Sequence, residues 1–167
     1  AAFNDLRNYL LAKLQWNVDA DVEYLMMDFL NAYYGEEAAP YIKEILDIQT
    51  GQIKATAHSF DFDWQYQSGY YTIPQIYKLN SLWDKALNAN VTDEQRFRVE
   101  KDNLSWEFFK ANQFLDEYFF LNPMRMKVQE KLYDDLIAHG ITKVSSFSTL
   151  PTNKDDINFI QRPIMWK

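Results

Sequence analysis

The 167-residue chain has the length of one domain, with 47% hydrophobic residues, 17% aromatic residues and a formal net charge of −7. This acidic balance argues against nucleic acid as a partner, because a phosphate backbone would be repelled. The chain has no cysteine, which excludes disulfides, thiolate zinc sites and cysteine nucleophiles, and no apolar run approaches the ~20 residues that cross a bilayer.

Two helices are predicted at the beginning of the chain. Apolar residues recur every three or four positions over residues 3–16, which predicts an amphipathic helix. The polar connection NVDAD then offers Asn17, Asp19 and Asp21 as N-caps for a second helix. We expect this helix to end at Gly35, because glycine adopts a left-handed conformation at little steric cost.

A third and a fourth helix are predicted on either side of an aromatic segment. The third starts near Glu36 and runs towards His58, and Gly51 is the position where it is most easily interrupted. The sequence Thr72-Ile-Pro-Gln75 has the pattern of a capping box with proline in the first turn, so it begins a helix that reaches Leu87.

The fifth and sixth helices follow directly. A second capping-box pattern, Thr92-Asp-Glu-Gln95, begins what should be the longest helix, to about Leu121. Asn122 pairs an N-cap with a proline at the next position, which predicts a last helix that ends at Gly140.

These elements predict an all-α fold, an antiparallel bundle or array of about six helices with an irregular C-terminal tail. We expect a single helical domain over residues 1–167, with the helical core in residues 17–140. The tail, residues 141–167, holds at most one short helical turn near residues 155–160.

Candidate catalytic and metal-binding residues are few. Asp135 and His139 lie one helical turn apart, so they form either part of a metal site or an ion pair near a helix C-terminus, where the helix dipole favours a cationic histidine. Three pairs of carboxylates are close in sequence: Asp61 with Asp63, Asp116 with Glu117, and Asp155 with Asp156. A glycosidase needs two carboxyl groups that face each other across roughly 5–9.5 Å, which adjacency on a helix does not provide. We therefore predict no catalytic residue, metal site or cofactor in this chain.

The segment of residues 58–71, HSFDFDWQYQSGYY, is predicted to be a long loop because it has no helical period. Its rings either cover the helix ends, face another domain or present their faces to a sugar. The candidate ligand-binding residues are His58, Asp61, Asp63, Trp64, Tyr66, Tyr70 and Tyr71.

The opening stretch LRNYLLAKLQWNVDADVEYLMMDFLNAYYG resembles the segment that ends the barrel and begins the helical C-terminal region in a family of bacterial glycoside-hydrolase-like proteins. This family is known mainly as a domain of unknown function and is similar in fold to α-glucuronidases and β-hexosaminidases. The matching positions are Leu6, Arg7, Tyr9, Ala12, Lys13, Leu14, Trp16, Asp21, Phe29, Tyr33, Tyr34 and Gly35. The later stretches YYTIPQIYKLNSLWDKAL and RFRVEKDNLSWEFFK, with Arg98, Val99 and Trp106, resemble the next helices of the family. Val18 departs from the pattern, where the family tends to carry proline.

The resemblance implies that residues 1–16 correspond to the last helix of a (β/α)₈ barrel, against which their apolar stripe would lie. In such proteins the catalytic carboxylates are expected on the barrel. This chain contains no βα repeats, so no catalytic residue is carried over.

Two functions follow as alternatives. The resemblance implies an accessory domain of a carbohydrate-active protein, which packs on the N-terminal barrel of the same polypeptide, rims a polysaccharide or oligosaccharide site or forms a homodimer, and is exported to the periplasm or cell surface. The other alternative is a self-sufficient helical sugar-binding or protein-interaction module with no enzymatic parent. The first predicts an exposed apolar patch within residues 3–14, and the second predicts a polar outer face there.

Overall fold

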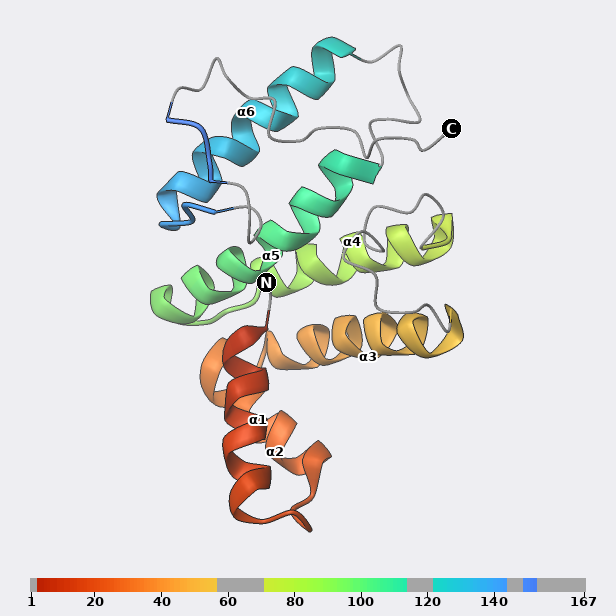
Figure 1. Cartoon of the computed structure of the whole chain (residues 1–167), viewed down its shortest axis with the longest axis vertical. Coiled ribbons are helices and arrows are strands. Elements are labelled where there is room, and N and C mark those ends of the chain that lie inside the picture. Colours follow the sequence, from red (N-terminus) through yellow and green to blue (C-terminus); the bar gives the residue numbers. More distant parts are fainter. Residues whose placement is uncertain (1–2, 57–70, 114–121, 144–148, 153–167) are drawn as a thin grey trace. The chain divides into compact units, whose positions relative to one another are not determined.

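The structure is a computed structural model that describes residues 3–56, 71–113, 122–143 and 149–152 (Figure 1). These residues form six helices: α1 (Asn4–Trp16), α2 (Val22–Tyr34), α3 (Ala39–Thr56), α4 (Ile73–Leu87), α5 (Asp93–Gln113) and α6 (Asn122–Ala138). Within these ranges the β contacts amount to one isolated antiparallel bridge, between Lys143 and Thr149. The predicted all-α array of about six helices is therefore confirmed.

The described residues divide into two compact units. The first contains residues 3–56 and 71–103, which are α1 to α4 and the first half of α5. The second begins at Leu104 and contains the rest of α5, α6 and residues 149–152. The expectation of a single domain over residues 1–167 stays a prediction. Among the described residues, no helix has the length and apolar character required to span a membrane.

The predicted caps begin the helices as expected. The Asp21 side chain accepts a hydrogen bond from the Tyr24 N–H at 3.1 Å, which satisfies one of the free donors in the first turn of α2. Thr72 and Gln75 form a reciprocal capping box at the start of α4. Before α5, the Thr92 N–H donates to Gln95 Oε1 at 3.1 Å and the Gln95 N–H donates to Thr92 Oγ1 at 3.3 Å.

The third helix begins later than predicted and runs through Gly51 towards residue 58, as expected. It begins at Ala39 instead of Glu36, because Gly35 has a φ of 91° and the following residues form a turn in which the Ala39 N–H donates to the Gly35 carbonyl at 2.9 Å. Gly51 does not interrupt it, and α3 continues to Thr56.

The other boundaries agree with the sequence where they can be compared. The helix α6 begins at Asn122 and ends at Ala138, and Gly140 follows with a φ of 68°. The predicted end of the fifth helix near Leu121 and the short helical turn near residues 155–160 lie outside the described residues.

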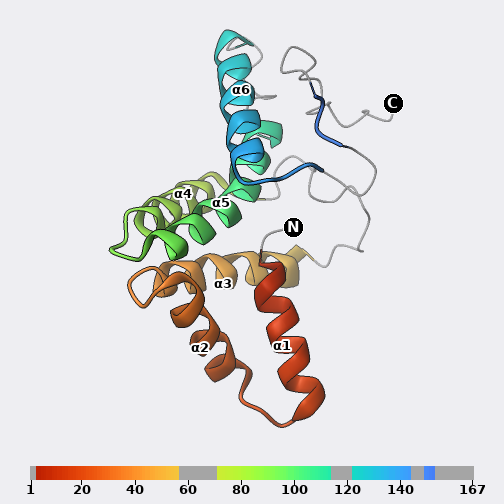
Figure 2. The same ribbon diagram turned by 90° about the vertical axis from the view of Figure 1, so that its left-hand side faces the viewer.

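In the first unit, consecutive helices pack against one another. The helices α1 and α2 form an antiparallel hairpin, α2 packs on α3, and α3 packs on α4, which runs in the opposite direction (Figure 1). A view from the side shows the hairpin projecting away from α3 (Figure 2). The fully buried side chains of this unit include Leu30, Tyr34, Ile42, Ile45, Leu79, Leu82, Trp83 and Val99. The hydrophobic core thus lies mainly where α2, α3 and α4 meet.

Phe3 fixes the start of α1. It is the N-cap residue and has a left-handed φ of 58°, which is unusual for a bulky side chain. Its ring stacks on the ring of Trp83 with centroids 6.1 Å apart, and its N–H donates to Asp102 Oδ1 at 3.1 Å. These contacts hold the strained conformation in place.

The second unit has a core of its own. Buried side chains from α5, α6 and the segment after α6 pack together: Leu104, Leu132, Tyr133, Leu136 and Leu150. The Tyr133 hydroxyl donates to the Pro151 carbonyl at 2.8 Å, and the Leu150 N–H donates to the Thr142 carbonyl at 2.9 Å. Part of the predicted tail is therefore attached to α6 without forming a helix.

Candidate functional site

The predicted ligand-binding set falls mostly outside the described residues. His58, Asp61, Asp63, Trp64, Tyr66 and Tyr70 belong to residues 57–70, which are not described, and the set stays a prediction. Tyr71 is described and lies half-buried two residues before α4.

The described residues do fix where this aromatic segment begins and ends. Gln75 Nε2 donates to Gln52 Oε1 at 2.9 Å, which joins the first turn of α4 to the last third of α3. Because α3 and α4 pack with opposite directions, the C-terminal end of α3 and the N-terminal end of α4 lie together. The described residues that flank the segment, Thr56 and Tyr71, therefore lie at the same end of this helix pair.

The second predicted pair, Asp135 and His139, forms no metal site with other described residues. His139 Nδ1 donates to the main-chain carbonyl of Asp135 at 2.8 Å, and the Asp135 carboxylate forms an ion pair with Lys131. In the part of the chain that the structure describes, no group of three or more His, Cys, Asp or Glu residues is placed to hold a metal ion. The carboxylate pairs Asp61 with Asp63, Asp116 with Glu117, and Asp155 with Asp156 lie outside that part.

The structure instead assembles a cluster of tyrosines and carboxylates at the base of the α1–α2 hairpin. Three phenols donate to three carboxylates: Tyr9 to Asp28 at 2.9 Å, Tyr33 to Asp5 at 2.6 Å, and Tyr34 to Asp102 at 2.5 Å. The ring of Phe29 packs between them, with centroids 5.2 Å from Tyr9 and 4.8 Å from Tyr33. We call these seven residues the tyrosine–carboxylate cluster.

The environment of this cluster keeps its phenols protonated. Burial, followed by the hydrogen bond and the negative charge of Asp5, raises the pKa of Tyr33 to about 12, although Arg98 acts in the opposite direction. Burial and the Asp102 carboxylate raise the pKa of Tyr34 further. For Asp102, burial raises the pKa, while the hydrogen bonds from Tyr34 and the Phe3 N–H oppose this shift.

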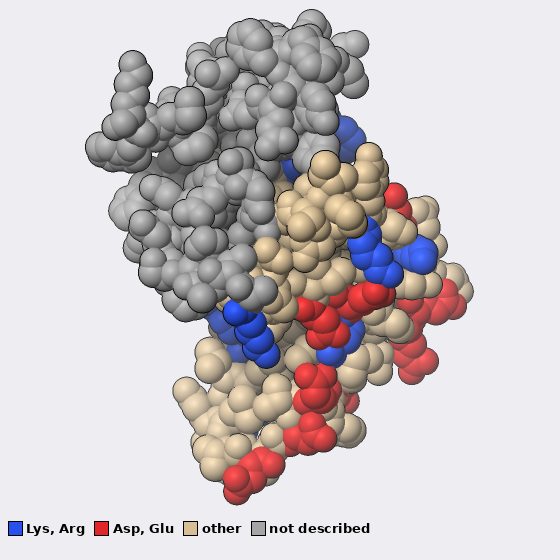
Figure 3. Space-filling view, turned by 90° about the vertical axis from the view of Figure 1, so that its right-hand side faces the viewer, with Lys and Arg blue, Asp and Glu red and all other residues tan. Residues whose placement is uncertain are grey.

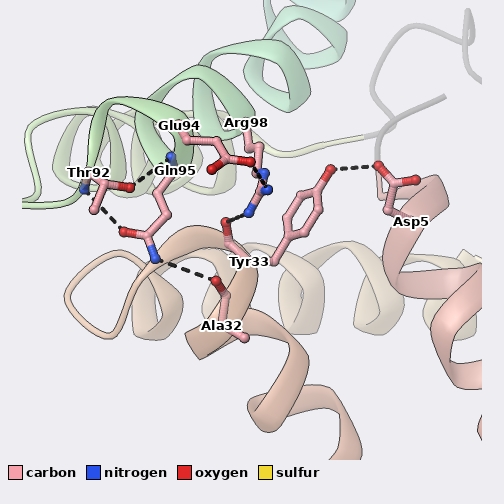
Figure 4. A network of polar contacts seen from close by, with 7 residues as sticks. All are labelled: Asp5, Ala32, Tyr33, Thr92, Glu94, Gln95 and Arg98. Atoms are coloured by element: carbon pink, nitrogen blue, oxygen red, sulfur yellow. Dashed lines mark hydrogen bonds and ion pairs between the residues drawn. The ribbon is translucent and has the colours of Figure 1, made fainter.

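Arg98 and Gln95 connect α5 to the C-terminal end of α2 (Figure 4). The Arg98 guanidinium lies over the Tyr33 ring, 4.4 Å from its centroid, and donates to the Tyr33 carbonyl at 3.1 Å. It also pairs with Glu94. Gln95 Nε2 donates to the Ala32 carbonyl at 3.4 Å. Two carbonyls in the last turn of α2 thereby obtain donors from α5.

The hydrogen bonds of this cluster give it a structural role. Its three carboxylates accept hydrogen bonds from its three phenols, and the raised pKa values of Tyr9 and Tyr33 keep these two phenols protonated at neutral pH. The cluster therefore holds α1, α2 and α5 together.

Sequence reasoning did not identify the role of Asp102, although a signal for it existed. Asp102 lies three residues after Val99 and four before Trp106, both buried on α5, so helical periodicity places its carboxylate on the inward face. The tyrosines Tyr9, Tyr33 and Tyr34 are among the positions that carry the family resemblance.

The hairpin exposes several apolar side chains among its polar and charged ones. In the predicted patch, Phe3 and Leu6 are buried, Leu10 and Leu14 are half-buried, and Leu11 is 52% exposed. Further exposed apolar side chains follow towards the turn. We call the exposed set the hairpin surface: Leu11, Trp16, Val18, Val22 and Tyr24. The stripe of α1 is thus only partly covered by its neighbours.

Comparison with known proteins gives a partial match. Residues 1–47 match the model of a domain of unknown function, DUF4838. This stretch contains α1, α2 and the beginning of α3, and with it the whole hairpin surface. No curated protein and no solved structure matches the chain.

Proposed function

We propose that this chain is an accessory helical domain of a carbohydrate-active, glycoside-hydrolase-like protein, in which the α1–α2 hairpin packs on a catalytic barrel of the same polypeptide. The observation that carries the proposal is the exposed hairpin surface, which lies entirely within the residues that match the family model. We infer that the partner is a barrel from the resemblance of the opening stretch to the segment that ends a barrel.

The energetics favour covering this surface. Complete burial of a side chain of the size of Val, Leu or Phe contributes roughly 1.5–3 kcal/mol. The hairpin surface leaves five large side chains partly or almost fully exposed, from Val22 at 41% to Trp16 at 94%. Exposed apolar patches of this kind mark interaction sites.

The described residues are consistent with a domain that has a structural role and a barrel that carries the catalytic residues. Asp5, Asp28 and Asp102 serve the tyrosine–carboxylate cluster, while a (β/α)₈ barrel carries its catalytic carboxylates at the ends of its strands. We further propose that the aromatic segment between α3 and α4 rims the saccharide site or supports a homodimer.

The test is to produce the complete natural polypeptide and, separately, the 167-residue chain. Both are assayed for hydrolysis and for binding against a panel of aryl glycosides and oligosaccharides. We expect activity or binding with the complete polypeptide and neither with the chain alone. A polypeptide without an upstream barrel, or glycan binding by the chain alone that is lost in Trp64→Ala, would favour the self-sufficient sugar-binding module instead.

A further inference from the structure

The far end of the hairpin concentrates its exposed apolar side chains. We define the hairpin tip as residues 16–24, which join α1 to α2 (Figure 2). Its exposed apolar members are Trp16 at 94%, Val18 at 79%, Val22 at 41% and Tyr24 at 69%. Two of the four are aromatic, and Trp and Tyr dominate the binding energy of protein interfaces.

Local hydrogen bonds order the turn between α1 and α2. The Asn17 N–H donates to the Lys13 carbonyl at 2.9 Å, and the Asn17 side chain accepts from the Asp19 N–H at 3.1 Å. Asp21 caps α2 through the Tyr24 N–H. A surface that is already ordered loses less conformational entropy on binding, so the tip is suited to act as a preformed anchor.

The negative charge of the tip favours a partner surface of opposite charge. Residues 16–24 contain three acidic residues, Asp19, Asp21 and Glu23, and no Lys or Arg. Glu23 pairs with Lys43 of α3 at 3.1 Å, which leaves Asp19 and Asp21 as the charges beside the apolar side chains. Figure 3 shows this end of the molecule as uncharged surface edged by carboxylates. A second copy of the tip would bring like charges together, so the expected partner surface is basic.

We propose that Trp16 anchors the domain by inserting into an apolar recess bordered by Lys or Arg on the barrel of the same polypeptide, with Asp19 facing that basic border. This inference rests on the proposed function and names the contact through which the two parts join. The ordered turn, the exposure of Trp16 and the acidic border together carry it.

The first experiment compares Trp16 in the complete natural polypeptide and in the 167-residue chain by hydroxyl-radical footprinting with mass spectrometry. We expect Trp16 to be modified roughly tenfold more slowly in the complete polypeptide, because interface anchors are fully desolvated. Tyr77 on α4, which is 70% exposed and outside the hairpin, serves as the internal control and should react at the same rate in both.

The second experiment measures hydrogen exchange of the tip amides in the complete polypeptide. For Trp16→Ala we expect the equilibrium constant for docking to fall by about 30-fold, as for the loss of a hot-spot residue, and exchange at the tip to become faster. Tyr77→Ala should leave this exchange unchanged. Asp19→Asn should weaken docking at low salt and reduce its dependence on salt, because a rim charge acts through screened attraction.

Each outcome decides between the possibilities. The inference is overturned if Trp16 is modified at the same rate in both proteins, or if hydrogen exchange at the tip is the same in Trp16→Ala and Tyr77→Ala. The proposed function still stands in that case if the glycan assay succeeds with the complete polypeptide. Protection of Trp16 in the chain alone that grows with its concentration also overturns the inference, because the tip would then bind a second copy. A polypeptide with no upstream barrel overturns both.

Discussion

The phenol of Tyr34 donates a hydrogen bond of 2.5 Å to Oδ2 of Asp102, a residue 68 positions later in the chain. The other carboxylate oxygen of Asp102 accepts from the Phe3 N–H at 3.1 Å. One side chain of α5 therefore ties the beginning of α1 to the end of α2. The attachment of the hairpin to the rest of the first unit depends strongly on this carboxylate.

Removal of the Tyr34 hydroxyl should destabilise the first unit. In Tyr34→Phe, the half-buried Asp102 carboxylate loses its phenol donor, and a hydrogen bond to a charged group contributes about 1.5–3 kcal/mol. We expect a loss of this size in the free energy of unfolding, measured by urea denaturation. Tyr9→Phe removes a phenol whose acceptor, Asp28, is exposed, and should cost less than about 1 kcal/mol. Equal effects of the two variants would contradict the assigned role.

The ionisation of Asp102 should lower stability as the pH rises. Burial raises its pKa in the folded protein above that of the unfolded chain, although Tyr34, the Phe3 N–H and Lys101 oppose the shift and Asp5 adds to it. The folded state therefore favours the protonated form, and this contribution is complete below about pH 4, the unfolded pKa, and is lost as the pH rises through the raised pKa.

The matching variant is Asp102→Asn, which cannot ionise. The difference between its free energy of unfolding and that of the unmodified chain should change between about pH 4 and neutral pH, in favour of the variant at the higher pH. Urea denaturation at several pH values measures this difference. Parallel pH curves would show that the pKa of Asp102 is not raised in the folded state.

The ionisation of Tyr33 should lower the stability of the folded protein at alkaline pH. Its pKa is raised to about 12, whereas an unfolded tyrosine ionises near pH ~10. The stability that this shift contributes is complete below pH ~10 and is lost as the pH rises towards the folded pKa. The phenolate absorbance of Tyr33→Phe, compared with the unmodified chain, should lack one group that titrates at about pH 12. If the missing group titrates near pH ~10, the ordinary value for tyrosine, neither the burial of Tyr33 nor its bond to Asp5 persists in solution.

Substitution of two glycines by alanine should have opposite effects. Gly35 has a φ of +91°, and a Cβ atom there would lie 2.7 Å from Val91 Cγ1 and 2.9 Å from Gln95 Oε1. We expect Gly35→Ala to cost about 1–3 kcal/mol of stability from backbone strain, before any cost of the close contacts.

Gly51 lies inside α3, and a Cβ atom added there would meet no neighbouring atom within 4 Å. We therefore expect Gly51→Ala to stabilise the protein by about 0.5–1 kcal/mol. Thermal unfolding of both variants measures the signs, and a stabilising Gly35→Ala would contradict the structure.

Local signals predict the helices well because they act over a few residues. Asp21, Thr72 and Thr92 begin their helices as expected, since a cap requires only a side-chain oxygen and a donor two or three residues later. The predicted start of α3 is wrong because the turn after Gly35 also depends on a distant contact. There the Glu37 carboxylate accepts from the Asn90 N–H at 3.0 Å.

The candidate site is less predictable than the fold. The ligand-binding residues of the aromatic segment are predicted from their chemistry, and six of the seven lie outside the described residues, so this set stays a prediction. The tyrosine–carboxylate cluster does not follow from the sequence. Its partners lie 19, 28 and 68 positions apart, and no local pattern pairs residues at such distances.

Periodicity and capping are local properties, so the amino-acid sequence is sufficient to predict the helices, the start of most of them and the apolar stripe of the hairpin. Which part of that stripe is covered follows only from how the helices pack. Leu6 is buried while Leu11 is 52% exposed, because burial depends on which helices meet, and that is set by contacts between residues far apart in the chain.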